Sequence, residues 1–198
     1  MEPQQSIIQN THDDQSTIPP KKEHFLKEII KFTLIALAVV IPIRTYVAQP
    51  FIVNGFSMYP TFSSGEYLIV DELTYNFKKP ERQDVIVLRY PLSPKTYFIK
   101  RIIGLPEETL IVKDGQITII NKENPEGITI NDSYVVPSHR KKDNFKITLG
   151  PKEYFVMGDN RTESSDSRVW GSLEEKYIVG RPIIRLTPLS KISFFPGK

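Results

Sequence analysis

Residues 109–120 read TLIVKDGQITII and carry the clearest structural signal in the chain. Two short runs rich in Ile, Val and Thr flank Asp114-Gly115, a dipeptide typical of the two-residue turn of a β-hairpin, where both central residues adopt a positive φ. Both runs are mainly apolar, and such runs on either side of this dipeptide are the strongest short-range signal of a hairpin. The segment therefore predicts an antiparallel hairpin.

From about residue 48 onward, similar short runs alternate with Gly, Pro, Asn and Asp. No part of this region shows convincing helical periodicity, and 16 prolines among 198 residues suit a β-rich chain better than a helical one. We therefore predict a mainly β, antiparallel domain over residues 48–198. The predicted strands are 51–54, 67–71, 85–90, 96–103, 109–113, 116–120, 146–149, 154–157 and 177–185.

The N-terminal region has a different composition. Residues 1–24 are largely polar and are predicted to form a disordered cytoplasmic tail. Lysines then precede an uncharged run from Phe32 to Ile43. We predict a single transmembrane anchor over residues 25–47, with the β-domain on the extracytoplasmic side, because positive charge favours the cytoplasmic flank. A cleaved signal peptide and a buried soluble helix are the two alternatives.

The composition excludes several classes of chemistry. The chain contains no cysteine, which excludes disulfides, thiolate metal sites and a cysteine nucleophile. Its three histidines, His12, His24 and His139, are too dispersed to predict a metal site. A net charge of +3 without a basic cluster does not indicate nucleic-acid binding. We therefore expect no metal, no other cofactor and no nucleic-acid partner.

Ser57 is a candidate nucleophile, although an ordinary serine in a turn has the same appearance. It follows a predicted strand in the segment NGFSMYPT, residues 54–61, where Gly55 and Pro60 constrain the turn. A nucleophilic hydroxyl needs such a rigid bend, with backbone N–H groups nearby to hold an oxyanion. A serine nucleophile also needs a base, and His139 lies in a basic segment that reads as an exposed loop.

Lys100 is the better candidate for the base. It lies in the nearly continuous apolar strand TYFIKRII, residues 96–103, where alternation puts it on the face of Phe98 and Ile102. Burial lowers the pKa of a lysine, and a neutral amine can accept a proton from Ser57. The alternative is an edge-strand lysine whose ammonium group reaches solvent.

A second polar segment, GDNRTESSDSR at residues 158–168, follows a predicted apolar strand. Its alternating acidic and basic residues predict local ion pairs, either in a solvated loop or in a hydrogen-bonded scaffold around a site. Its spacing and its two arginines exclude an EF-hand-like calcium loop.

Together, four segments resemble the boxes of type I signal peptidases, which are membrane-bound Ser/Lys endopeptidases of bacteria and organelles. The segments are residues 55–61, 65–70, 100–106 and 158–171, in family order. The resemblance extends from about residue 25 to the end of the sequence. It implies a barrel-like antiparallel β fold, and the short interval before residue 158 implies a small β cap over roughly 110–152.

The resemblance also implies roles for matching residues. Ser57 would form the acyl-enzyme, and Lys100 would be the general base. Ser164 would orient the lysine amine, Asp166 and Arg168 would form an ion pair beside it, and Arg101 follows the base as in the family. Predicted substrate-binding positions are Val53, Gly55, Met58, Phe98 and Ile99.

The sequence departs from the family pattern at two positions near this site. Gly55 stands where many members have a serine that donates to the oxyanion, so this side-chain donor is missing. Glu163 replaces a usual asparagine beside Ser164 and could change the electrostatic field near Lys100.

The activity implied is cleavage of N-terminal signal peptides from exported preproteins, after small residues in an Ala-x-Ala pattern. The implied partners are preproteins and membrane lipid. A self-cleaving repressor-type protein, whose family shares a Ser/Lys fold, is one alternative, but the sequence lacks its DNA-binding segment and its cleavage dipeptide. An inactive, membrane-anchored β-domain that binds export partners is the other.

Overall fold

The computed structural model describes residues 22–42 and 48–198. The chain divides into two compact units, Met1–Ile41 and Pro42–Lys198. Helix α1 (Lys22–Pro42) makes up the described part of the first unit and ends one residue beyond it. The tail predicted over residues 1–24 lies outside the described residues except at 22–24, where α1 begins.

In the described ranges, no helix combines the length and the apolar character needed to cross a membrane. The transmembrane helix predicted over residues 25–47 is therefore not confirmed, and residues 43–47 of that prediction lie outside the described residues.

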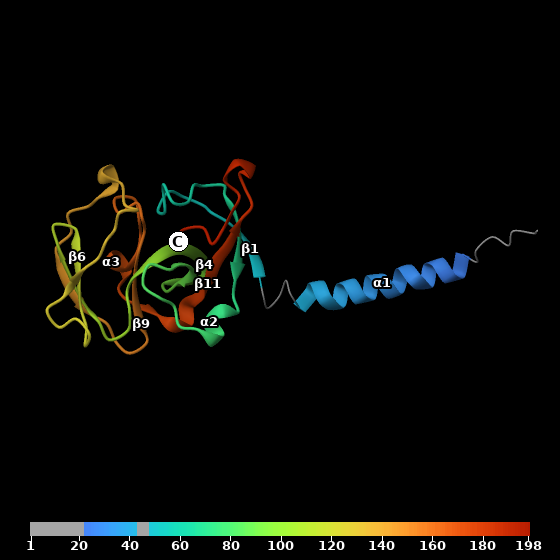
Figure 1. Ribbon diagram of the computed structural model, residues 1–198, viewed down its shortest axis with the longest axis horizontal. Coiled ribbons are helices and arrows are strands. Elements are labelled where there is room, and N and C mark those ends of the chain that lie inside the picture. The colour runs from blue at the N-terminus through green and yellow to red at the C-terminus, as the bar shows by residue number, and fades with distance from the viewer. Residues whose placement is uncertain (1–21, 43–47) are drawn as a thin grey trace, which may run out of the picture. The chain divides into compact units, whose positions relative to one another are not determined.

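The second unit is built from two antiparallel sheets (Figure 1). The larger sheet has the order β1-β2-β11-β3-β4-β9-β10, with β12 paired to β11. Its strands are β1 (Ala48–Ile52), β2 (Tyr67–Asp71), β3 (Val85–Tyr90), β4 (Ser93–Gly104), β9 (Glu153–Met157), β10 (Leu173–Glu174), β11 (Ile178–Arg185) and β12 (Ser193–Phe194). The mainly β, antiparallel fold is thus confirmed.

The smaller sheet contains the hairpin predicted from residues 109–120. Its order is β7-β6-β5-β8, with β5 (Thr109–Lys113), β6 (Gln116–Ile120), β7 (Ile128–Thr129) and β8 (Phe145–Thr148). Asp114 and Gly115 have φ values of 49° and 82°, the positive values that the two-residue turn requires. The buried side chains of β5 and β6 pack against Ile103, Phe155 and Met157 of the larger sheet.

The larger sheet does not close into a barrel, so the barrel-like part of the prediction is wrong. Its end strands are β1 and β10. β1 meets β4 through the rings of Phe51 and Tyr97, whose centroids are 5.3 Å apart, and not through a ladder of backbone hydrogen bonds. Among the described strands, β1 therefore pairs with β2 alone, and the backbone of its other edge is unpaired.

Most predicted strands agree with the observed ones within one residue, and the first strand differs most. β1 ends at Ile52, while the prediction extended to Asn54. The chain leaves the sheet early because Gly65 N donates to Val53 O at 2.8 Å, which closes a loop at that point.

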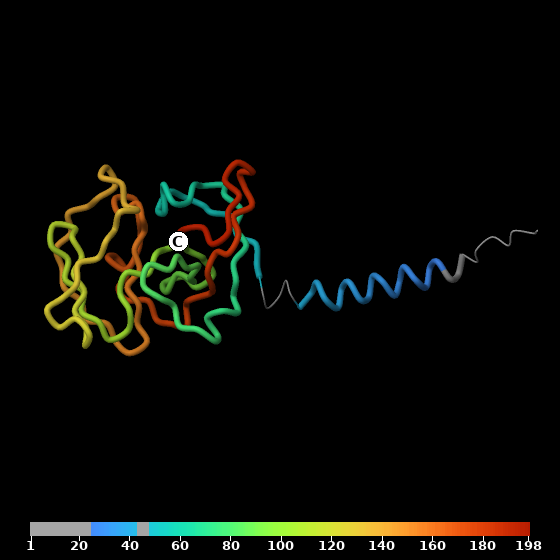
Figure 2. The backbone as a smooth tube through the Cα atoms, in the orientation of Figure 1, coloured from blue at the N-terminus to red at the C-terminus, as the bar shows by residue number. Residues whose placement is uncertain are grey.

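Short helices complete the unit and position its loops. They are α2 (Thr74–Phe77), η2 (Pro137–His139), α3 (Ser167–Trp170), η3 (Glu175–Tyr177) and η4 (Leu189–Lys191). Near the end of the sequence, the chain returns to the larger sheet (Figure 2), where Gly197 lies against Phe62 and Val85.

Candidate active site

Ser57 lies on a loop over residues 53–66, called here the Ser57 loop. Its base is closed by two backbone hydrogen bonds, from Val53 N to Glu66 O at 2.9 Å and from Gly65 N to Val53 O at 2.8 Å. Gly55 and Gly65 have φ values of 96° and 88°, which glycine adopts without the steric cost of a Cβ. The chain can therefore reverse tightly on both sides of Ser57.

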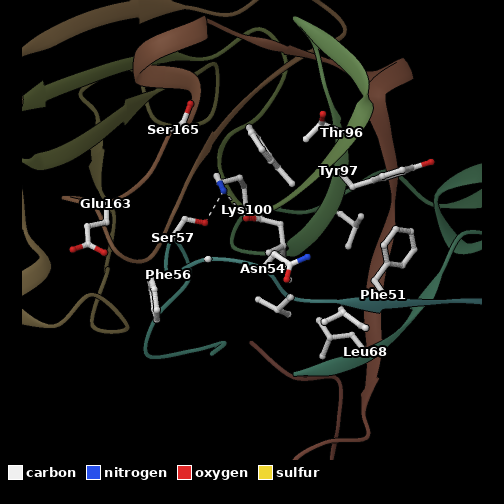
Figure 3. Close-up of a pocket in the computed structure, with 16 residues that line it drawn as sticks. Phe51, Asn54, Phe56, Ser57, Leu68, Thr96, Tyr97, Lys100, Glu163 and Ser165 are labelled. Atoms are coloured by element: carbon white, nitrogen blue, oxygen red, sulfur yellow. Dashed lines mark hydrogen bonds between the residues drawn. The ribbon is translucent and has the colours of Figure 1, made fainter. Parts of the chain in front are cut away.

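Lys100 reaches Ser57 from β4 (Figure 3). Its Nζ donates to Ser57 Oγ at 2.7 Å and to Ile99 O at 2.9 Å. The amine also lies 4.9 Å from the centre of the Phe98 ring, on the face that strand alternation predicted. The residue is only 3% exposed, which excludes the alternative of a lysine that reaches solvent.

Burial lowers the pKa of Lys100 from its usual value near 10.5 to about 8. The negative charges of Asp166 and Asp159 oppose this shift without cancelling it. The amine can therefore lose its proton near neutral pH, which is the property that a lysine base needs.

Asp166 and Arg168 form the predicted ion pair. Arg168 Nε and Nη2 donate to the two carboxylate oxygens of Asp166, each at 2.8 Å, and Gly158 N donates to Oδ2 at 3.0 Å. Burial alone would raise the pKa of Asp166, but the hydrogen bonds and charge of Arg168 outweigh it and the pKa is lowered. Asp166 therefore stays charged at neutral pH.

Ser164 was predicted to orient the lysine amine, and its hydroxyl is buried close to this ion pair. It helps to lower the pKa of Asp166, but it makes no hydrogen bond of ordinary geometry among the described residues. A Cβ on Gly158 would lie 2.4 Å from both Ser164 Oγ and Ser57 O. Only glycine at residue 158 allows the polar segment to pack this closely on the Ser57 loop.

Arg101 and Asp159 form a second buried ion pair. Arg101 Nε and Nη2 donate to the Asp159 carboxylate at 2.8 and 2.6 Å, a bidentate geometry. Asp159 also accepts a hydrogen bond of 2.5 Å from Thr61 Oγ1, and Asn160 N donates to Ser57 O at 3.0 Å. The pair therefore connects β4 to the Ser57 loop. Sequence reasoning singled out neither Asp159 nor Thr61, although both lie inside matching segments.

Glu66 and Arg185 hold the other side of the Ser57 loop, and sequence reasoning missed both roles. Arg185 Nε lies 3.1 Å from Glu66 Oε2, and Arg185 Nη2 donates to Thr61 O at 2.7 Å. Glu66 is almost fully buried. No local pattern links two residues so far apart in sequence, so only the pairing of β2 with β11 reveals the contact.

A groove of about 570 Å³ adjoins Ser57 and Lys100 (Figure 3). Four of the predicted substrate positions, Val53, Gly55, Phe98 and Ile99, line it. Met58 does not. Its side chain is 1% exposed and packs in the core with Phe62 and Leu68, because the turn after Ser57 directs it inward.

The Ser57 backbone N–H has no protein acceptor among the described residues, so it is available to an oxyanion. The N–H of Gly55 is occupied by Ser64 Oγ at 3.3 Å. His139 packs its ring against Tyr59, with centroids 5.6 Å apart, and makes no hydrogen bond to Ser57. The geometry thus brings a serine, a buried amine and a free N–H together.

Comparisons with known proteins agree on one family. The family model described as "Signal peptidase, peptidase S26" matches residues 26–187. A "Probable signal peptidase I-1" of Synechocystis is 34% identical over 89% of this chain and 90% of its own length. "Signal peptidase I P" of Bacillus subtilis subsp. natto is 35% identical over 87% of this chain and 95% of its own length.

Two further similarities come from a plant and from a solved structure. "Thylakoidal processing peptidase 1, chloroplastic" of Arabidopsis thaliana is 33% identical over 84% of this chain and 50% of its own length. The crystal structure of a signal peptidase I from Enterococcus faecalis V583 is 28% identical and has a TM-score of 0.45. The match covers 52% of this chain and 97% of that one.

Proposed function

Because the chain belongs to the type I signal peptidases of peptidase family S26, we propose that it cleaves signal peptides with Ser57 as nucleophile and Lys100 as general base. It is a serine peptidase, and preproteins that carry signal peptides are its substrates. Because the chain belongs to this family, the alternative hypothesis of a self-cleaving repressor-type protein is set aside. The observation that carries the proposal is the 2.7 Å separation of Ser57 Oγ and a buried Lys100 Nζ.

The proposed reaction proceeds through an acyl-enzyme. Neutral Lys100 accepts the Ser57 hydroxyl proton while Oγ bonds to the carbonyl carbon of the scissile peptide. The Ser57 N–H donates to the oxyanion. As the C–N bond breaks, Lys100 returns the proton to the leaving amine. Water then attacks the ester, again with Lys100 as base, and releases the carboxylate and free Ser57.

The low pKa of Lys100 supports this role. With a pKa of about 8, about a tenth of the amine is neutral at pH 7. The ion pairs around it position the site: Asp166–Arg168 holds the polar segment, and Arg101–Asp159 joins β4 to the Ser57 loop. Ser164 is proposed to orient the amine when it is neutral, since its buried hydroxyl has no other partner of ordinary geometry among the described residues.

The groove supports selection of small side chains before the cut. Open edges of β1 and of the first half of β4 border it and can pair with an extended peptide. Val53, Phe98 and Ile99 supply apolar walls, which suits an Ala-x-Ala segment. The backbone of Gly55 borders the same groove.

We also propose attachment to a membrane through the N-terminal segment, with the tail cytoplasmic and the catalytic domain on the outer side. Helix α1 exposes large apolar side chains, such as Phe32 at 74% and Leu34 at 61%, which favours contact with lipid. Lys27 and Lys31 lie in its first half. Alkaline extraction and protease protection of the full chain in sealed vesicles test attachment and orientation separately.

The dyad is tested by Ser57→Ala and Lys100→Ala in the full chain, with an Ala-x-Ala preprotein as substrate. Each variant is expected to lose at least about 10³-fold in kcat/KM, because it removes the nucleophile or the base. An acylating inhibitor should label Ser57 of the unmodified enzyme, as seen by peptide mass spectrometry.

His139→Ala is the matched control and should retain activity. Full activity of Lys100→Ala would overturn the dyad. An unlabelled Ser57 in a folded enzyme would instead favour the inactive β-domain.

A further inference from the structure

Glu163 is the one acidic residue among those that line the groove beside Ser57. Its side chain is exposed and makes no ion pair or hydrogen bond among the described residues. Within the described part of the chain, the hydrogen bonds of Glu163 use only its backbone N–H, which donates to Asn160. Every neighbouring carboxylate described above is neutralised by an arginine. An unpaired carboxylate at the edge of the groove is therefore available to a substrate.

Ser57 and Lys100 lie between two parts of the groove that are lined by different kinds of side chain. Figure 3 shows Glu163 and Phe56 on one side of the Ser57–Lys100 pair, and Phe51 and Leu68 on the other. The side with Phe51 and Leu68 is apolar and suits the residues before the cut. The peptide continues past Ser57, so its residues after the cut pass along the side with Glu163.

We propose that Glu163 makes the enzyme prefer substrates with a lysine or arginine in the first two residues after the cut. The inference rests on the proposed function of the site. Phe56 is 60% exposed on the same side, so its ring can pack against the aliphatic stem of such a side chain. The cationic head then pairs with the Glu163 carboxylate.

The effect acts on substrate selection and not on the base. The charges that act most on the pKa of Lys100 are those of Asp166 and Asp159. Glu163 is exposed, so its pair with a substrate cation is screened by solvent and salt. The preference for a cationic over a neutral residue is expected to be about two- to fivefold in kcat/KM.

The experiment uses the full chain in detergent and peptides with one Ala-x-Ala site. The peptides differ only at the first or second residue after the cut, which is Lys, Gln or Glu. Variants are Glu163→Gln, Glu163→Lys and, as a control of equal charge change outside the groove, Glu126→Gln. The readout is the ratio of kcat/KM between Lys and Gln peptides, at low salt and at high salt.

The Lys/Gln ratio of kcat/KM is expected to exceed two for the unmodified enzyme and for Glu126→Gln. It should fall toward one in Glu163→Gln or at high salt. Glu163→Lys should reverse the order and favour the Glu peptide. A ratio of one in an enzyme that cuts the Gln peptide would overturn this inference alone. An equal loss on all peptides in Glu163→Gln would also overturn it. If the unmodified enzyme cuts no peptide, the proposed function fails instead.

Discussion

The smaller sheet and the surroundings of Ser57 use opposite kinds of buried residue. β5 and β6 bury Leu110, Val112, Ile117 and Ile119 against apolar neighbours. Around Ser57, by contrast, the buried side chains include charged groups paired across the chain, such as Arg101 with Asp159 and Asp166 with Arg168. Apolar packing tolerates small adjustments, whereas a buried ion pair needs both partners in place.

This difference shows which region serves stability alone and which must also hold a geometry. The smaller sheet needs only a buried apolar face. The Ser57 region maintains a 2.7 Å contact to a lysine whose burial is unfavourable for its charged form. A substitution in the smaller sheet should therefore lower stability alone, whereas one near Ser57 can also change activity.

The largest effect on folding is expected from Asp159→Asn. The change leaves Arg101 buried at 3% exposure without its countercharge, and it should lower the free energy of unfolding by about 3–5 kcal/mol. Urea unfolding followed by fluorescence measures this loss. Glu81→Gln, which breaks an exposed pair with Lys78, is the control and should leave the midpoint unchanged. Equal midpoints for the two variants would mean that the buried pair stabilises the fold no more than the exposed one.

Leu110→Ala tests the smaller sheet. Its side chain is fully buried, and its removal should lower the free energy of unfolding by about 2–5 kcal/mol. Activity per folded molecule should stay close to that of the unmodified enzyme, because no group near Ser57 changes. Ile128→Ala, at an exposed position of β7, is the matched control. A tenfold loss of kcat/KM in folded Leu110→Ala would show that the two regions are coupled.

The pH profile tests the Ser57 region without substitution. Below pH 8 Lys100 becomes protonated, so kcat/KM should fall about fivefold from pH 8 to pH 7 and about tenfold from pH 7 to pH 6, about fiftyfold in all. The lowered pKa of Asp166 means that its stabilising charge is lost only below its ordinary range, so the fold persists at pH 6. Initial rates and circular dichroism at each pH separate the two. A flat rate profile down to pH 5 would contradict a lysine base.

The smallest effect is expected from Thr61→Val. It removes the 2.5 Å hydrogen bond to Asp159 while keeping the shape of the side chain. The loss should be about 1–2 kcal/mol of unfolding free energy. Thr61→Ser keeps the hydroxyl and should recover most of the stability in the same unfolding assay. Identical curves for the Val and Ser variants would mean that the bond does not hold the loop.

The same contrast explains what the sequence could predict. The hairpin of the smaller sheet follows from two apolar runs around Asp114-Gly115 and was predicted residue by residue, whereas β7 was not predicted. Alternation also places Lys100 on an apolar face, and the effect of burial on a lysine pKa suggests Ser57 as its partner, a pairing that the resemblance to a family also implies. Asp159 and Thr61 are 98 residues apart in sequence, and no local pattern reports their contact.

Other differences have equally physical causes. Met58 follows Ser57 directly, and its direction depends on the turn, which buries it in the core. That the larger sheet stays open could not be predicted from strand positions, because β1 and β4 meet through the rings of Phe51 and Tyr97 and not through backbone pairing. Alternation along each strand determines its buried face but not the strand that lies beside it.

The contact of Arg101 with Gly197 bears on the order in which the fold is completed. Arg101 Nη1 donates to Gly197 O at 2.7 Å, beside the ion pair with Asp159. During synthesis, the hydrogen-bonding of Arg101 is complete only after residue 197 has left the ribosome. A nascent chain therefore finishes this support of β4, the strand that carries Lys100, only after β12 has been synthesised.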